Sequence, residues 1–310
     1  MHEEISIPEL GEVVARLSAL FGPRAGAVRP LEGGITNRNF LVNFGGDDYV
    51  VRLPGKDTSL LGIDREAECL ATKQAAELDM GPKVAAMFEE PACLVTCFVE
   101  GRQLTTADLR DPDTLAQVAQ RLRRFHESGL TLPTEFQVYD VVRRYAAVAR
   151  ERGGAPPAAF EQSLDSARRI VDAVGDHPEH QPRPSHNDLL AANFLHTGER
   201  VVIVDWEYAG MGDPFFDLGN FTVNNELGEA DAERLLDAYF GEPATAGQLA
   251  ALRLMRFMSD FREAMWGVVQ SSVSELDFDF PDYADKHFRR LAETSGDERF
   301  ERWLAEARGD

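Results

Sequence analysis

Cysteine is scarce in this sequence, with 3 in 310 residues, and no two of them have Cys-x-x-Cys spacing. The three are Cys69, Cys93 and Cys97. An odd number without paired spacing argues against a disulfide framework and against a zinc site. Free thiols are typical of a reducing compartment, so we expect a cytoplasmic protein.

Positive charge is also in short supply: 32 Lys and Arg residues stand against 53 Asp and Glu residues, which gives a net charge of −21. Nucleic acids and anionic membranes attract clustered cations, so we predict neither as a partner. An acidic surface keeps a protein in solution, which is the plainer interpretation. The alternative is that the negative field attracts a cationic substrate.

Long apolar runs are missing as well. None approaches the roughly 20 residues that a transmembrane helix needs, and the N-terminus MHEEISIPEL lacks the apolar region of a signal peptide. What the sequence does have is 44% hydrophobic and 27% charged residues, a balance that supports an ordinary folded core. At roughly 100–200 residues per domain, 310 residues predict two domains.

The pattern of apolar residues changes near residue 100. Before it, the periodicity predicts helices over 5–20 and 63–79 and strands over 40–44, 49–53, 84–88 and 93–98. After it, helices are predicted over 105–128, with a break at Pro112, and over 137–152, 157–174 and 246–272, with a short strand at 201–204. We therefore expect an α+β protein with a small antiparallel sheet in residues 1–98 and a mainly helical part in 99–310.

Two neighbouring stretches carry the strongest indication of chemistry: HNDLLAANF at 186–194 and VVIVDWE at 201–207. Asp188 and Asn193 lie five residues apart on a predicted loop, and Asp205 follows seventeen residues after Asp188, at the end of an apolar strand. Phosphoryl transfer needs such a set, with one carboxylate to orient the attacking hydroxyl and hard oxygen ligands to hold Mg²⁺. The alternative is a polar loop whose side chains cap backbone amides, but the second Asp at this distance favours the catalytic interpretation.

The two stretches resemble the catalytic loop of protein kinases, H-R-D-x-x-x-x-N followed by a metal-binding Asp. They resemble more closely the version in choline/ethanolamine kinases and aminoglycoside phosphotransferases, in which Phe-Gly does not follow the second Asp; here Trp206 and Glu207 follow it. The resemblance implies a two-lobed protein-kinase-like fold, with Asp188 as the catalytic base and Asn193 and Asp205 as magnesium ligands.

Three further residues near these stretches follow from the same resemblance. His186 and Asp217 are expected to support the catalytic loop without taking part in the reaction. Glu207 is a candidate substrate contact.

The glycine-rich stretch LEGGITNRNFLV at 31–42 places Gly33 and Gly34 between an expected strand and the strand predicted over 40–44. Glycines let a backbone approach phosphates closely, although a glycine pair in a hairpin is usually only a turn. The stretch resembles the phosphate loop of choline kinases. The resemblance implies nucleotide contacts at Gly33, Gly34, Thr36, Asn37 and Asn39.

Arg52 lies near the end of the next predicted strand. Protein kinases place a Lys here to bind phosphates, paired with a Glu on the next helix, whereas choline kinases commonly use Arg, which binds phosphate bidentately. We predict that Arg52 binds ATP and acts in catalysis, and that Glu66 pairs with it; Glu68 is the alternative, on another side of the helix. By the same resemblance, Cys97 and Val99 hold the adenine through their backbones.

The C-terminal part resembles choline kinases in the stretch SDFREAMWGVVQSSVSELDFDF at 259–280, and it lacks the Ala-Pro-Glu segment of protein kinases. Aromatic faces bind quaternary ammonium groups, at roughly 0.5–2 kcal/mol each. The substrate candidates are Trp266 and Tyr283, together with Glu263, which stands where eukaryotic choline kinases have another Trp. Core packing is the alternative for both aromatic residues.

The resemblance extends over roughly residues 28–292. It predicts an enzyme that uses ATP and Mg²⁺ to phosphorylate the hydroxyl of a small amino alcohol, choline or ethanolamine. A kinase for another small alcohol or amine, such as thiamine or an aminoglycoside, is the first alternative. A nucleotide-binding module without activity is the second; it would be expected to lack Asp188, Asn193 or Asp205, and all three are present.

Overall fold

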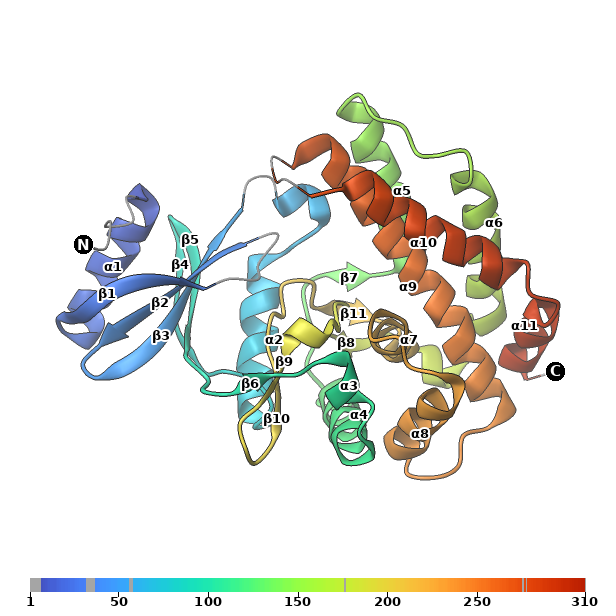
Figure 1. Cartoon of the computed structure of the whole chain (residues 1–310), viewed down its shortest axis with the longest axis horizontal. Helices are drawn as coiled ribbons and strands as arrows, with labels where there is room; N and C mark the ends of the chain where they lie inside the picture. Colours follow the sequence, from blue (N-terminus) through green and yellow to red (C-terminus); the bar gives the residue numbers. More distant parts are fainter. Residues whose placement is uncertain are drawn as a thin grey trace.

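The computed structural model describes residues 7–31, 37–55, 58–175, 177–274, 276 and 278–309. Figure 1 shows a small sheet with one outer helix at one end of the molecule and a large group of helices at the other. The α+β architecture predicted from the sequence is therefore confirmed.

The N-terminal sheet has five antiparallel strands in the order β1-β2-β3-β5-β4. Their bounds are Arg24–Leu31, Asn37–Phe44, Asp47–Pro54, Ala92–Cys97 and Val84–Glu89 in that spatial order. The strands predicted over 40–44 and 49–53 pair as a hairpin, β2 and β3, with a turn of only two residues, Gly45 and Gly46. Both have positive φ, 62° and 98°, which glycine adopts without steric cost.

The sheet has a small hydrophobic core of its own. Helix α1 (Pro8–Phe21) lies on the side of the sheet away from the other helices (Figure 1). Its buried residues Leu10, Val13 and Leu17 follow one face of the helix and pack with apolar residues of β2 and β3. This core is separate from the core of the helical part.

Helix α2 (Arg65–Glu77) lies between the sheet and the helical part. Asp64 caps its start, accepting a hydrogen bond of 2.8 Å from the backbone N–H of Ala67. The buried face of α2, which includes Ala67, Ala71 and Ala75, belongs to the large core of the helical part. The rotation of α2 about its axis is therefore fixed from the helical side, and this decides which of its side chains can reach β3.

The remaining elements make up the helical part and its short strands. The helices are α3 (Thr106–Leu109), α4 (Pro112–His126), α5 (Val138–Glu151), α6 (Phe160–Val174), α7 (Pro214–Asn224), α8 (Glu229–Phe240), α9 (Ala246–Val273), α10 (Phe280–Ser295) and α11 (Phe300–Arg308). The strands are β6 (Arg102–Gln103), β7 (Glu135–Phe136), β8 (Arg183–Ser185), β9 (Phe194–His196), β10 (Val201–Ile203) and β11 (Gly210–Gly212). Three 3₁₀ turns are η1 (Thr58–Leu61), η2 (Pro178–His180) and η3 (Ala191–Asn193).

The helix predicted over 105–128 divides into α3 and α4 at the predicted break. Thr105 caps α3 with its hydroxyl, and Asp111 caps α4. Pro112 is the first residue of α4, a position where its missing N–H costs no helical hydrogen bond. The break therefore has a local cause that the sequence already contained.

Helix α9 is the centre of the helical part, and α5, α6, α7, α10 and α11 pack around it (Figure 1). Gly219 of α7 makes one of these contacts close, because a Cβ at this position would lie 2.7 Å from the backbone carbonyl carbon of Met255. In the described ranges, the helices are each too short or too polar to cross a bilayer.

Two small sheets hold the segment that carries the predicted catalytic residues. One has the order β10-β9-β6, and the other β7-β11-β8. In the first, Arg102 pairs with His196, so the chain just after the N-terminal sheet is joined to the strand that follows η3. The predicted loop residues between β8 and β9 are thus anchored at both ends.

Candidate active site

The loop that carries Asp188 lies between β8 and η3, and a buried carboxylate of α7 shapes it. Asp217 accepts hydrogen bonds from the backbone N–H groups of His186, at 2.8 Å, and Asn187, at 2.7 Å. Burial on its own would raise the pKa of Asp217, but the hydrogen bond from His126, at 3.0 Å, and the nearby His186 outweigh it and lower the pKa. Asp217 therefore stays ionised as it holds the loop, including Asn187 at a φ of 67°.

His186 is buried and bonded at both ring nitrogens. Nε2 lies 3.0 Å from the carbonyl oxygen of Val204, and Nδ1 accepts from the backbone N–H of Asp188 at 3.2 Å. Burial lowers the pKa of His186, so the ring is neutral with its proton on Nε2. This arrangement joins the loop that carries Asp188 to the end of β10.

Asn193 and Asp205 lie beside Asp188. The side-chain amide of Asn193 donates to the backbone oxygen of Asp188 at 2.8 Å, which leaves its Oδ1 for another partner. The backbone N–H of Val204 donates to the carbonyl oxygen of Asn193 at 2.9 Å, so the residue before Asp205 is tied to η3. Local backbone pairing thus brings the two predicted magnesium ligands together.

A cavity of about 320 Å³ lies between the sheet and this loop. Asn193 and Asp205 line it together with Arg52 of β3. Its apolar walls include Leu31, Val50, Leu94, Val99, Leu195 and Trp206, and Cys97 and Asn39 also face it. The predicted contacts Gly33, Gly34 and Thr36 lie outside the described residues.

The predicted pair between Arg52 and Glu66 is wrong. Arg52 Nη1 donates to Oε1 of Glu68 at 3.1 Å, and Glu66 is exposed. Residues 66 and 68 differ by about 200° around a helix, so only one of them can face Arg52. Glu68 lies on the buried side of α2 together with Thr72, one turn further on, and both line the cavity beside Arg52.

Arg52 also bonds to the carboxylate of Asp205, which lines the same cavity. Burial would lower the pKa of Arg52, but Asp205, Glu68 and Glu207 outweigh it and raise the pKa further. The guanidinium is therefore permanently charged. It joins β3, α2 and the end of β10 at one point of the cavity wall.

Glu207, predicted as a substrate contact, is buried at 3% exposure. Its Oε2 accepts from the side-chain amide of Asn37 on β2 at 2.7 Å and lies 3.7 Å from Arg65. Arg65 in turn donates to Glu68 at 2.7 Å. Glu207 thus connects the sheet to the catalytic segment, and Asn37 is engaged in this connection.

On the other side of Asp188, away from Arg52, lies an arginine of α9. Arg262 Nη1 donates to Asp188 Oδ1 at 3.0 Å and to Glu263 Oε1 at 2.6 Å. Its guanidinium carbon lies 4.3 Å from the ring centre of Tyr208. Burial raises the pKa of Asp188 to about 7; Arg262 opposes this rise, and Glu263 and Asp205 add to it.

Three of the predicted substrate residues, Glu263, Trp266 and Tyr283, form one group beside Arg262. The hydroxyl of Tyr283 donates to Glu263 Oε2 at 2.7 Å, so both oxygens of Glu263 are bonded. Trp266 packs edge-on against Tyr283, with ring centres 5.7 Å apart, and its indole N–H donates to Tyr208 at 3.1 Å. Trp266 is 7% exposed, which favours packing for most of its ring.

Comparisons with known proteins fit this geometry. A family model described as choline/ethanolamine kinase matches residues 28–231. The chain belongs to this family. It is therefore a small-molecule kinase with a kinase-like fold, as predicted.

Solved structures and curated relatives agree. A choline/ethanolamine kinase family protein from Mesorhizobium loti superposes with a TM-score of 0.82 at 30% identity, over 97% of this kinase and 100% of that chain. Choline kinase LicA from Streptococcus pneumoniae has a TM-score of 0.78 at 23% identity, over 93% and 98%. Protein LicA from Haemophilus influenzae is 29% identical over 275 residues, which are 84% of this kinase and 99% of the relative.

Sequence reasoning overlooked Arg262 in this kinase. On a helix its neighbours at i−4, i−3, i+3 and i+4 are Met258, Ser259, Met265 and Trp266, and all are buried. An arginine in such a buried stripe needs a carboxylate partner. That signal was present in the sequence, but it does not say which carboxylate is the partner.

Proposed function

We propose that this kinase transfers the γ-phosphate of ATP to the hydroxyl of choline or ethanolamine. The observation that carries the proposal is that Arg52, Asn193 and Asp205 line one cavity, and that Asn193 is bonded directly to Asp188. Phosphoryl transfer depends mostly on positioning and charge stabilisation, and these four groups offer both.

The residues around the cavity fit a magnesium-bound nucleotide. Asn193 Oδ1 and the Asp205 carboxylate are hard oxygen donors on one wall, and Mg²⁺ uses one or two protein ligands besides water and phosphates. Among the described residues, three or more metal-binding side chains nowhere cluster together, so a metal held by protein and phosphates together suits this chain. When bound, magnesium neutralises charge on the phosphates. Asn39 Oδ1, buried at the cavity without a partner among the described residues, is available to a nucleotide.

Asp188 would receive or orient the proton of the substrate hydroxyl. Its pKa of about 7 suits a general base that works near neutral pH, because proton transfer is most efficient when the pKa of the base is close to the working pH. Arg52, beside Asp205, would neutralise phosphate charge. His186 and Asp217 would keep the loop in this geometry.

Glu263 and the aromatic rings of Trp266 and Tyr283 support a cationic amino alcohol as substrate. Both a carboxylate and an aromatic face attract an ammonium group. Because Glu263 is bonded to Arg262 and Tyr283, a bound cation would have to share it with them. The family match supports choline and ethanolamine over thiamine and aminoglycosides.

The test is ATP consumption by the purified protein with Mg²⁺ and, separately, choline, ethanolamine, thiamine and an aminoglycoside mixture. We expect stimulation by choline or ethanolamine. Asp188→Asn should reduce turnover by roughly 10²–10⁴-fold, the usual contribution of a general base, with ATP affinity nearly unchanged. Stimulation by thiamine or aminoglycosides alone would show that the substrate is neither choline nor ethanolamine. Turnover near the wild-type value in Asp188→Asn would refute the role of Asp188.

A further inference from the structure

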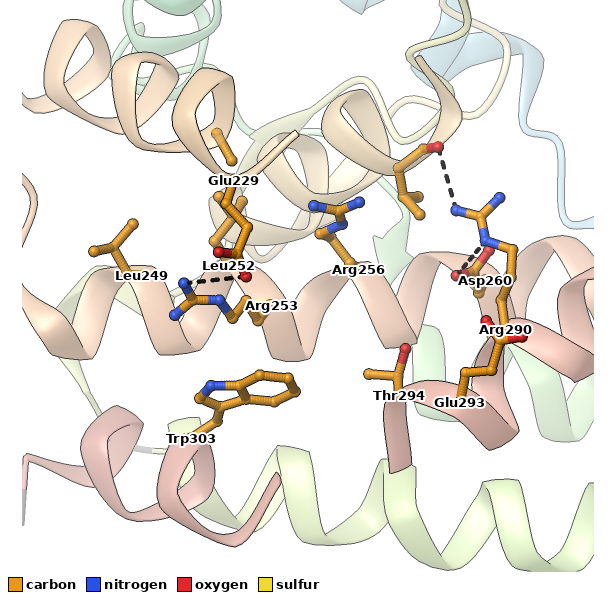
Figure 2. A pocket seen from close by; sticks show the side chains of 12 residues that line it. Glu229, Leu249, Leu252, Arg253, Arg256, Asp260, Arg290, Glu293, Thr294 and Trp303 are labelled. Carbon is orange, nitrogen blue, oxygen red and sulfur yellow. Dashed lines mark hydrogen bonds and ion pairs between the residues drawn. The ribbon is translucent and has the colours of Figure 1, made fainter. Parts of the chain in front are cut away.

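A second pocket, of about 260 Å³, lies among α8, α9, α10 and α11. It shares no lining residue with the cavity beside Asp188. Figure 2 shows three arginines around it, Arg253 and Arg256 from α9 and Arg290 from α10, with Trp303 of α11 at its edge. Three carboxylates, those of Glu229, Asp260 and Glu293, also line it, so what matters is which of the guanidinium groups they neutralise.

Two of the three arginines have carboxylate partners. Arg290 Nε lies 3.2 Å from Asp260 Oδ2, and its Nη2 donates to the carbonyl oxygen of Val223 at 3.3 Å. Arg253 Nη2 lies 3.7 Å from Glu229 Oε1, which is too long for a hydrogen bond. Glu229 is shared, since Arg299 also lies 3.6 Å from the same oxygen.

Arg256 differs from both. Within the described part of the chain it makes no hydrogen bond and no ion pair, although it is partly buried and its guanidinium lies between Arg253 and Arg290 in Figure 2. Burial lowers the pKa of Arg256, and the like charges of Arg290 and Arg253 lower it further, against Asp260 and Glu229. A partly buried, unpaired cation is costly unless something of opposite charge meets it.

The size and lining of the pocket indicate which kind of anion would lie beside Arg256. A water needs roughly 10–15 Å³ of such space, so 260 Å³ holds more than a bare ion. Guanidinium groups match phosphate oxygens bidentately. Leu249, Leu252 and the ring of Trp303 add an apolar surface beside the carboxylates of Glu229, Asp260 and Glu293.

We propose that this pocket binds a small phosphomonoester. The phosphate lies on Arg256, flanked by Arg253 and Arg290, and the organic part lies against Leu252 and Trp303. The site is independent of the phosphotransfer assigned above, because none of these residues lines the cavity beside Asp188.

The test is isothermal titration calorimetry with phenyl phosphate, methyl phosphate and inorganic phosphate at constant ionic strength. A saturating non-hydrolysable ATP analogue occupies the nucleotide cavity, so that binding there does not contribute. We expect one phenyl phosphate per chain, bound more tightly than methyl phosphate or inorganic phosphate because of the apolar wall. Arg256→Gln should weaken binding at least tenfold, and Arg256→Lys, which keeps the charge but not the planar fork, should weaken it less.

Arg302→Gln is the matched control. Arg302 lies on α11, next to Trp303 in sequence. It is 61% exposed, and among the described residues it pairs only with Glu306 at the surface. It should bind as the wild type does, and phenyl phosphate should raise the Tm of wild type and Arg302→Gln but not of Arg256→Gln. Equal affinity in wild type and Arg256→Gln, or no binding to wild type at millimolar phenyl phosphate, would overturn the proposal.

Discussion

At the scale of single residues, Asp188 lies between charges of opposite sign. Arg262 donates to it at 3.0 Å and favours the carboxylate, whereas burial and the carboxylates of Glu263 and Asp205 favour the neutral acid. Burial and the two carboxylates outweigh Arg262, so the pKa of Asp188 rises to about 7. Small changes in this surrounding should therefore move the pH dependence of the enzyme.

We predict that kcat/KM rises with pH and levels off above about pH 7. Only the ionised carboxylate accepts a proton, and below the folded pKa of about 7 the acid form prevails, so activity falls about tenfold per pH unit there. A pH–rate profile from pH 5.5 to 8.5 measures this. Arg262→Gln should move the fall to higher pH, since it removes the cation that opposes the rise, whereas the exposed Arg143→Gln should leave it in place. A profile that stays flat down to pH 5.5 would contradict the role of Asp188 as base.

A second test at this scale asks whether Glu66 or Glu68 of α2 is the partner of Arg52. Glu68→Gln should lower kcat/KM for ATP about tenfold or more, because a hydrogen bond to a charged group contributes about 1.5–3 kcal/mol and each 1.4 kcal/mol is a factor of about ten. Glu66→Gln is the matched control, since Glu66 lies two residues away on the same helix and is exposed. Steady-state kinetics of both variants decide it: a larger loss in Glu66→Gln than in Glu68→Gln would show that Arg52 changes partner during the reaction.

At the scale of elements, the contact of α7 with α9 positions the catalytic loop. Helix α7 carries Asp217, which holds the loop backbone, and Asn220, which accepts from the backbone N–H of Leu189 at 2.6 Å. Gly219 lies between these two residues and against the backbone of α9. The distance between the two helices thus affects the position of the loop.

Gly219→Ala should lower the free energy of unfolding by about 1–3 kcal/mol, the usual cost of overpacking. The added methyl group would lie 2.7 Å from the backbone carbonyl carbon of Met255 and 2.9 Å from the backbone nitrogen of Arg256. Neither backbone atom can rotate away as a side chain could. Urea denaturation measures the change. Gly11→Ala is the control, because Gly11 lies inside α1 with nothing within 4 Å of a Cβ, and it should be neutral or stabilising by about 0.5–1 kcal/mol. Equal stability of wild type and Gly219→Ala would mean that α7 shifts without cost.

At the scale of the whole molecule, two hydrophobic cores are joined across the cavity that Arg52 and Asp205 line. The sheet and α1 share one core, and the helical part together with α2 forms the other. Polar contacts complete the connection: Asn37 of β2 donates to Glu207 at 2.7 Å, and Arg52 of β3 bonds to Asp205. The position of the sheet over the cavity therefore depends on a few charged and amide groups.

We predict that Glu207→Ala loosens the sheet without unfolding the helical part. Native-state hydrogen exchange should become faster in β2 and β3 and stay unchanged in α7 and α9, because local opening depends on local contacts. Glu127→Ala is the control: Glu127 is exposed and pairs with Arg123 at the surface, so no amide should exchange faster. Faster exchange throughout the chain would indicate global destabilisation instead.

The elements that the sequence predicted are those whose cause is local. Gly45 and Gly46 allow the tight turn of the β2–β3 hairpin, and Pro112 with Asp111 starts α4. Strands β6 to β9 and β11 were not predicted, because two or three residues are too few for an alternating pattern. They exist through pairing with distant segments, as Arg102 does with His196.

The sequence alone determined the family resemblance and the set of catalytic candidates. Asp188, Asn193 and Asp205 lie close along the chain, and they therefore stay near one another in the fold. The tertiary structure decided that Glu68 rather than Glu66 meets Arg52, and that Arg262 meets Asp188. It also brought the arginines of α9 and α10 to one pocket. Each of these depends on how a helix is rotated about its axis, and that rotation is fixed by the packing of its buried face against distant parts of the chain.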